Sequence, residues 1–191
     1  MEAFLVSAGV VALGEIGDKT QLLALMLAAR FQRPLPIIAG ILVATLVNHA
    51  LAGLAGNVVR GMLPPDVLRW FIAISFFAVA LWALKPDTLD KDEPAPMSRW
   101  GVFGVTAGMF FLAEMGDKTQ VATMVLAARF DSLVAVVLGT TVGMLIADVP
   151  VVLIGKTASA RIPFKAVRIA AALLFGALGV YALLVPTLPG G

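Results

Sequence analysis

Cysteine is absent from this 191-residue sequence, and charged residues make up only 14% of it. The lack of cysteine excludes a disulfide scaffold, an iron–sulfur protein and any thiolate metal site. Soluble domains usually carry about 25% charged residues. The scarcity of charge, with 60% hydrophobic residues and a mean hydropathy of +0.98, therefore excludes a soluble single domain. The net charge is only +2, and the Lys and Arg residues are scattered among apolar runs. The sequence therefore offers no basic face for binding nucleic acid.

Long apolar runs account for nearly the whole chain. A helix needs about 20 mainly apolar residues to cross a bilayer. Six such runs lie between prolines and charges that mark their ends, at 3–29, 35–59, 67–84, 101–128, 133–155 and 167–185. The first run lacks a basic segment before it and a small-residue cleavage site after it, so we expect a retained helix rather than a signal peptide. The sequence therefore predicts an all-α polytopic membrane protein with six transmembrane helices.

The most informative feature is an internal repeat. The motif Glu-Ile-Gly-Asp-Lys-Thr-Gln at 15–21 recurs as Glu-Met-Gly-Asp-Lys-Thr-Gln at 114–120, and Leu-Ala-Ala-Arg-Phe follows each copy at the same offset of 99 residues. Each copy opens three predicted spans. Because three is odd, the second copy must enter the membrane upside down relative to the first. We therefore expect a 3+3 inverted-topology repeat, with three-helix repeats at 1–84 and 100–191 and a charged cytoplasmic linker at 85–99.

The orientation of the predicted spans follows from their flanking basic residues. Leaving aside Lys19 and Lys118, nine Lys and Arg residues lie in or directly beside the odd-numbered connections and three in or directly beside the others. Cytoplasmic loops carry the excess of Lys and Arg. This distribution predicts that both termini lie outside and that the central loop is cytoplasmic.

Each copy of the motif places two carboxylates and a lysine near the middle of a predicted span. A charge at the centre of a membrane helix costs about 2.5–3.5 kcal/mol on insertion scales, so intramembrane charges are usually functional. Residues at i, i+3 and i+4 share a helical face. We therefore expect Glu15, Asp18 and Lys19 to point the same way. The equivalent residues of the second copy are Glu114, Asp117 and Lys118.

Two such faces meeting at the repeat axis would form a pocket of four carboxylates and two ammonium groups, with a net charge of −2. One divalent cation would neutralise this charge, as would two protons once the cation has left. Carboxylate and amide oxygens suit Ca²⁺, Mn²⁺ or Mg²⁺. The predicted metal ligands are Glu15, Asp18, Glu114 and Asp117, with Gln21, Gln120, Thr20 and Thr119 as secondary candidates. The structural alternative is that the charges pair within each helix and so allow it to insert into the membrane. This alternative is weakened because each lysine offsets only one of the two carboxylates in its motif.

Two further polar residues lie in the second and fifth predicted spans. His49, the only histidine, and Asp148 occupy equivalent positions of the repeat, and both could extend a proton path from the central site. Lys19 and Lys118 would balance its charge. For His49 the alternative is a hydrogen-bonded interior residue. Asp148 has the stronger functional claim, because it is a bare acid in an apolar span just before Pro150.

The doubled Glu-x-Gly-Asp-Lys-Thr motif, each copy opening a three-span half, resembles that of the Gdt-type family of manganese and calcium exporters. The resemblance covers essentially the whole chain. It implies export of Mn²⁺, and in some members Ca²⁺, in exchange for protons, with the four motif carboxylates as metal-binding residues. It also implies a bacterial plasma-membrane protein with no resident cofactor, whose partners are the transported cations, protons and the lipid bilayer.

Other functions remain as alternatives. A passive divalent-cation channel could use the same carboxylates as a selectivity ring. An exporter of small organic cations or amino acids is also conceivable, although few aromatic residues lie near the motif. An enzyme ranks last, because the sequence shows neither a nucleophile flanked by a base nor paired metallopeptidase motifs.

Overall fold

The structure is a computed structural model that describes residues 1–85, 101–154 and 164–185. These residues form helices and no strand. In chain order the helices are α1 (Glu2–Glu15), α2 (Lys19–Phe31), α3 (Pro34–Met62), α4 (Pro65–Ala83), α5 (Gly101–Glu114), α6 (Lys118–Arg129), α7 (Leu133–Ile154) and α8 (Phe164–Leu184). The prediction of an all-α protein is confirmed for this part of the chain.

Within the described ranges, three helices are long and apolar enough to cross a membrane, namely α3, α4 and α7. Two shorter apolar helices are Gly101–Glu114 and Arg168–Leu184. Many large apolar side chains on these helices are exposed, Leu81 at 73% and Leu173 at 69% among them. Such a surface suits contact with lipid chains rather than water. Six spans in a 3+3 arrangement remain a prediction, as does the division at 84 and 100. The predicted linker at 85–99 lies outside the described residues except for Lys85.

The predicted first and fourth spans are each broken in two, so the expectation of continuous helices over 3–29 and 101–128 was wrong. Helix α1 ends at Glu15 and α2 begins at Lys19, while α5 ends at Glu114 and α6 begins at Lys118. The breaks centre on Gly17 and Gly116, whose φ angles are 84° and 71°. Glycine adopts this left-handed conformation without the strain that a Cβ atom causes. The repeated motif is therefore a helix-breaking element.

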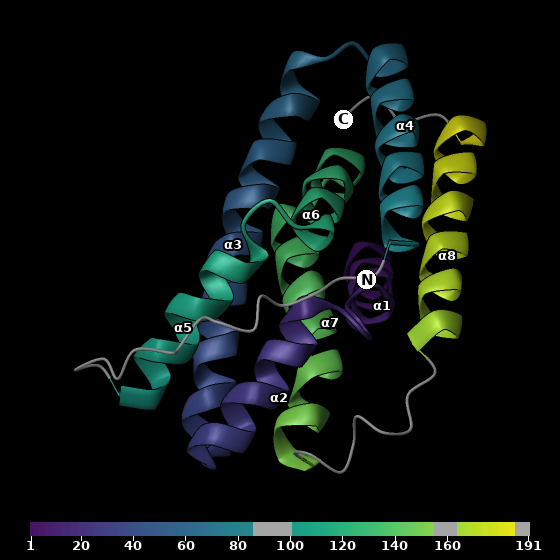
Figure 1. The fold of residues 1–191 in the computed structure, drawn as a ribbon. Helices are drawn as coiled ribbons and strands as arrows, with labels where there is room; N and C mark the ends of the chain where they lie inside the picture. The colour runs from purple at the N-terminus through teal and green to yellow at the C-terminus, as the bar shows by residue number, and fades with distance from the viewer. Residues whose placement is uncertain (86–100, 155–163, 186–191) are drawn as a thin grey trace.

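The two halves of the chain interdigitate instead of standing side by side. Helix α1 packs against α7 of the other half, and α5 packs against α3, which is the same contact under the 99-residue offset. Helices α3 and α7 pack against each other, and so do α4 and α8, which lie together at one side of the molecule (Figure 1). As a result, each motif break lies next to helices of the other half.

Glycines set the close approach at the first two of these contacts. A Cβ atom built on Gly139 would lie 2.5 Å from the backbone oxygen of Phe4, and one built on Gly40 would lie 2.9 Å from that of Phe103. All four residues obey the 99-residue offset. Small residues let membrane helices approach closely enough for backbone contact. The repeat is therefore preserved in the packing as well as in the motif.

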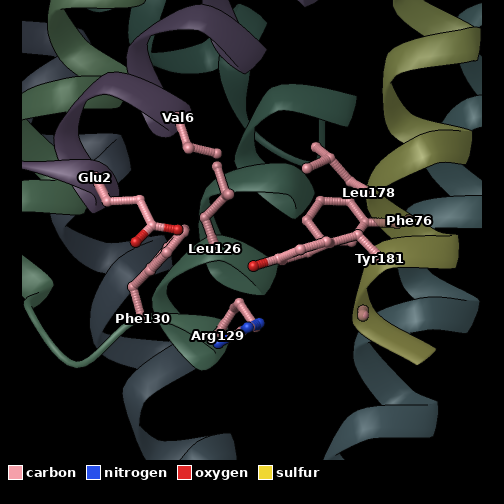
Figure 2. Close-up of a pocket in the computed structure, with 9 residues that line it drawn as sticks. Glu2, Val6, Phe76, Leu126, Arg129, Phe130, Leu178 and Tyr181 are labelled. Atoms are coloured by element: carbon pink, nitrogen blue, oxygen red, sulfur yellow. The ribbon is translucent and has the colours of Figure 1, made fainter. Parts of the chain in front are cut away.

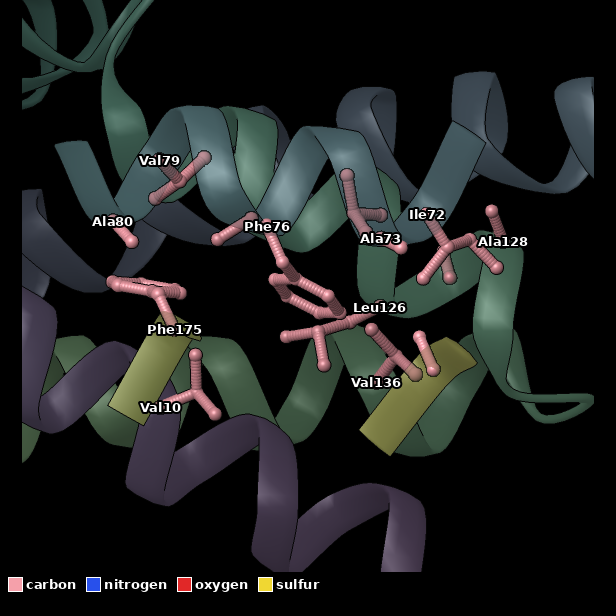
Figure 3. Close-up of a cluster of buried hydrophobic side chains, with 14 of the residues drawn as sticks. Val10, Ile72, Ala73, Phe76, Val79, Ala80, Leu126, Ala128, Val136 and Phe175 are labelled. Atoms are coloured by element: carbon pink, nitrogen blue, oxygen red, sulfur yellow. The ribbon is translucent and has the colours of Figure 1, made fainter. Parts of the chain in front are cut away.

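The largest apolar cluster joins the α4–α8 pair to the rest of the molecule. Phe76 of α4 and Phe175 of α8, another pair at the 99-residue offset, are both buried, with ring centroids 6.3 Å apart (Figure 3). Val10, Leu126 and Val136 belong to the same cluster, so α1, α6 and α7 all contribute to it. This cluster holds α4 and α8 against α1 and α6.

Candidate metal centre

In the first copy of the motif, the chain between α1 and α2 forms a tight, hydrogen-bonded break. Asp18 is the N-cap of α2 and accepts a hydrogen bond from the Lys19 backbone N–H at 2.6 Å. The backbone N–H of Gly17 donates to Oε1 of Gln21 at 2.9 Å. These bonds satisfy donors that a broken helix would otherwise leave open in an apolar medium. Gln21 thus supports the backbone of the break.

The second copy has the same backbone break, but within the described residues the Asp117 side chain accepts no capping hydrogen bond from α6. The backbone N–H of Gly116 donates to Oε1 of Gln120 at 2.8 Å, and Asp117 occupies the N-cap position of α6. Each motif therefore ends one helix with a glutamate and starts the next with an aspartate. The expected common face at i, i+3 and i+4 does not exist, because the helix stops between these residues. The carboxylates meet because the two breaks face each other.

Lysines of the two motifs pair across the repeat rather than within it. Nζ of Lys118 lies 3.1 Å from Oδ2 of Asp18, and Nζ of Lys19 lies 3.6 Å from Oδ1 of Asp117. The Lys118 side chain is 3% exposed and that of Lys19 is 26% exposed. A buried charge needs an opposite partner to offset its lost hydration. Each half of the chain therefore supplies the counter-charge for the other half.

Three of the four predicted metal ligands converge. One carboxylate oxygen from each of Glu15, Asp18 and Asp117 lies within 4.8 Å of the others, and all three residues are buried. Oxygen ligands lie about 2.3–2.6 Å from Ca²⁺ and slightly closer to smaller divalent ions, so opposite ligands are up to about 5 Å apart. The spacing and chemistry of these three oxygens fit a hard divalent cation.

The fourth predicted ligand, Glu114, is near the others but held differently. It accepts hydrogen bonds from Oγ1 of Thr45 at 2.7 Å and from Nδ2 of Asn48 at 3.1 Å, both on α3. Glu15 accepts instead from Oγ1 of Thr20, in its own motif, at 2.5 Å. The hydroxyl of Thr119, which is equivalent to Thr20, is buried and has no hydrogen-bond partner among the described residues.

Asp148 lies against the same acidic cluster. It is fully buried in α7, close enough to Glu15, Glu114 and Asp18 for their negative charges to repel. Neither of its carboxylate oxygens has a hydrogen-bond partner in the described part of the chain. His49, its equivalent on α3, is 1% exposed and likewise has both ring nitrogens without such a partner there. The bland alternative for His49, a hydrogen-bonded interior residue, finds no support in these contacts.

Thr45 is the site residue that sequence reasoning missed. Asn48, on the same helix, bonds between helices, donating to the backbone oxygen of Phe111 at 3.0 Å as well as to Glu114. Thr45, Asn48 and His49 follow the i, i+3, i+4 spacing of one helical face in an otherwise apolar segment. That spacing is the signal that could have identified Thr45.

The two glutamines also reach the opposite core helices. Nε2 of Gln21 donates to the backbone oxygen of Ala147 at 3.1 Å, and Nε2 of Gln120 donates to Oδ1 of Asn48 at 3.4 Å. Ala147 and Asn48 are equivalent under the repeat. The glutamines therefore connect each motif break to the central helix of the other half.

A separate cavity of about 310 Å³ lies away from this centre, at the far end of α6. Figure 2 shows Glu2, Leu126, Arg129 and Tyr181 around it. Arg129 is 12 residues beyond Asp117, about 18 Å along a helix. The walls are mainly apolar, and the guanidinium of Arg129 lies 5.7 Å from the centre of the Tyr181 ring. This cavity offers no cluster of oxygen ligands for a divalent cation.

Comparisons with known proteins identify the family of this chain. The family model described as "Divalent cation/proton antiporter GDT1" matches residues 3–91 and 102–188, two ranges that begin 99 residues apart. A protein named "Putative manganese exporter" from Vibrio cholerae is 51% identical over 92% of this chain and 87% of its own length. "GDT1-like protein 5" from Arabidopsis thaliana is 27% identical over 97% of both chains.

A third relative, "GDT1-like protein sll0615" from Synechocystis, is 27% identical over 92% of this chain and 93% of its own length. No solved structure gives a significant match. The family is one of membrane transporters, not of enzymes, in agreement with the sequence-based expectation. The family model matches both halves of the chain, and the Vibrio cholerae relative is 51% identical over 92% of it. This protein therefore belongs to the GDT1 family of divalent cation/proton antiporters.

Proposed function

We propose that this protein exports a divalent cation, Mn²⁺ first and Ca²⁺ second, in exchange for protons. The observation that carries the proposal is the convergence of Glu15, Asp18 and Asp117 within 4.8 Å, beside two lysines, at paired helix breaks inside a membrane protein. Three hard oxygen ligands favour Mn²⁺ or Ca²⁺ over soft ions. The name of the Vibrio cholerae relative supports Mn²⁺ as the first choice.

Charge balance supports exchange with protons. Without a divalent cation, Lys19 and Lys118 offset one aspartate each, and the remaining carboxylates are left to protons. A cation that enters between the aspartates would replace the ammonium groups at the aspartate oxygens and displace protons from the remaining carboxylates. We assign proton coupling to Asp148 and His49, which are buried beside this centre on the two central helices.

For the membrane arrangement we propose six spans as a 3+3 inverted repeat in a bacterial plasma membrane. In this arrangement each of the predicted first and fourth spans is a pair of half-helices, α1–α2 and α5–α6. Broken helices that meet at the midplane between inverted repeats are a common way to build an ion site in secondary transporters. The distribution of Lys and Arg supports termini on the outside and a cytoplasmic central loop.

The test is cation accumulation by proteoliposomes that contain the purified protein, with an imposed pH gradient and Mn²⁺, Ca²⁺ or Mg²⁺ supplied separately. We expect uphill Mn²⁺ movement that follows the proton gradient. The Asp117→Asn variant should transport at least 100-fold more slowly, because one of three converging ligands loses its charge. Asp66→Asn is the matched control, since its side chain is 93% exposed, and its flux should equal that of the wild type.

Other outcomes identify the alternatives. Flux that follows only the Mn²⁺ gradient, with no response to pH, would indicate a channel. Movement of organic cations but of no metal would indicate the organic-cation exporter. Unchanged Mn²⁺ flux in Asp117→Asn would refute the assignment of the site.

A further inference from the structure

The four motif carboxylates are not equivalent, and the asymmetry comes from α3. Thr45 and Asn48 on α3 donate hydrogen bonds of 2.7 Å and 3.1 Å to the two oxygens of Glu114. The equivalent positions on α7 are Met144 and Ala147, whose side chains cannot donate a hydrogen bond. Glu15 is therefore left to Thr20 of its own motif.

A second position for the Glu114 carboxylate is visible in the first copy of the repeat. There, Thr20 holds Glu15 among the three converging carboxylates, at 2.5 Å. The equivalent hydroxyl in the second copy, that of Thr119, is fully buried and has no hydrogen-bond partner among the described residues. Leaving a buried hydroxyl unpaired is unfavourable, and a native structure rarely does so without a reason.

We propose that Thr45 and Asn48 form a latch that controls the fourth cation ligand. With the latch closed, as in this structure, Glu114 is bound to α3 and the cation meets three carboxylates. With the latch open, Glu114 turns to Thr119, takes the position that Glu15 has beside Thr20, and becomes a fourth ligand. The latch therefore sets how tightly the cation is held and how readily it leaves. The inference rests on the proposed function of the same centre.

The latch acts by positioning and need not touch the cation. A buried hydrogen bond to a carboxyl group contributes enough to change an equilibrium by up to about tenfold. Thr45→Val removes one of the two donors with little change in volume. Glu114 is then freer to join the cation, so binding should tighten while release slows.

The experiment compares four variants of the full-length protein by two measurements. Equilibrium binding of Mn²⁺ to the purified protein in detergent is followed by the electron paramagnetic resonance signal of free Mn²⁺. Proteoliposome transport then gives KM and kcat. For Thr45→Val we expect Kd and KM to fall about tenfold and kcat to fall as well. Thr45→Ser keeps the donor and should behave like the wild type.

Two further variants make the test independent of general structural damage. Thr119→Val removes the alternative partner of Glu114 and should raise Kd, the opposite sign to Thr45→Val. Thr140→Val is the matched control, because Thr140 is also fully buried but its hydroxyl donates within α7, to the backbone oxygen of Val137 at 3.1 Å. Its Kd and KM should remain those of the wild type.

Several results would overturn the latch. Thr45→Val and Thr119→Val that shift Kd in the same direction would do so, as would a Thr45→Val variant with the Kd of Thr140→Val. If Thr45→Val does not fold, an unchanged Kd in Thr119→Val is decisive against the latch. A wild-type protein that binds Mn²⁺ while these variants bind it equally well refutes the latch alone. A wild-type protein that binds no divalent cation refutes the proposed function and the latch with it.

Discussion

The two halves of this protein carry nearly the same motif but surround it differently. In the first half, Glu15 is bound by a threonine of its own motif, and in the second half Glu114 is bound by two residues of α3. The motifs themselves differ only at Ile16 and Met115. The difference arises from the central helices. The polar residues of α3 are Thr45, Asn48 and His49, and the equivalent positions of α7 hold Met144, Ala147 and Asp148.

This comparison teaches that the repeat conserves backbone and charge but not the polar lining. The glycine breaks, the N-cap aspartates and the crossed lysine pairs all obey the 99-residue offset. The hydrogen-bond donors that α3 offers, Thr45 and Asn48, have no counterparts on α7, where Met144 and Ala147 stand at the equivalent positions. Asymmetry in function therefore has its origin on α3 and α7, and the following predictions compare equivalent positions of the two halves.

The largest expected difference concerns the two crossed ion pairs. Lys118→Gln should destabilise the protein more than Lys19→Gln, because the Lys118 side chain is 3% exposed and its pair is 3.1 Å long, against 26% and 3.6 Å for Lys19. Breaking a buried pair from one side typically costs about 3–5 kcal/mol, and the more exposed pair should lose less. Thermal unfolding in detergent measures both. Equal losses of stability in the two variants would contradict the ranking. Lys85→Gln is the control, because Lys85 is exposed just beyond the end of α4.

A smaller effect is expected at the paired glycines of the helix contacts. Gly139→Ala and Gly40→Ala each place a methyl group against backbone, at 2.5 Å from the oxygen of Phe4 and 2.9 Å from that of Phe103. Overpacking of this kind costs about 1–3 kcal/mol, with Gly139→Ala the more severe because its overlap is closer. Gly9→Ala and Gly108→Ala are also at equivalent positions and have open space around the glycine, so they should be neutral. Unfolding midpoints of the four variants make the comparison.

The smallest shift in stability, but a clear change in coupling, is expected at the residues assigned to protons. Asp148→Asn should lower Mn²⁺ transport driven by a pH gradient at least tenfold, while Mn²⁺ binding changes less. His49→Gln should have the weaker effect of the two, because no negative charge is lost. Transport driven by pH and equilibrium binding, measured on the same preparations, test this prediction. Equal loss of binding and transport in Asp148→Asn would make it a cation ligand instead.

Much of the site could be predicted from the sequence because its charged residues lie in two short, contiguous motifs. The doubled motif identified the four carboxylates and two lysines, and composition identified a helical membrane protein. The break of each motif helix was missed, because a single glycine is compatible with a continuous helix and its positive φ angle depends on the surrounding fold. The crossed pairing of lysines was missed as well, since spacing within one motif says nothing about how two copies face each other. Thr45 was missed because a single threonine in an apolar run stands out only when its i, i+3, i+4 spacing with Asn48 and His49 is considered.

The crossed lysine pairs have a mechanical consequence. Two contacts of opposite direction, Lys118 to Asp18 and Lys19 to Asp117, fasten the start of α2 to the start of α6 at two points. Asp18 precedes Lys19 directly in the sequence, and Asp117 precedes Lys118, so both contacts join the same two short segments. Sliding either helix by one turn, about 5.4 Å, would therefore break both contacts together. The relative position of α2 and α6 and the pairing of their charges are therefore coupled, because neither can change without the other.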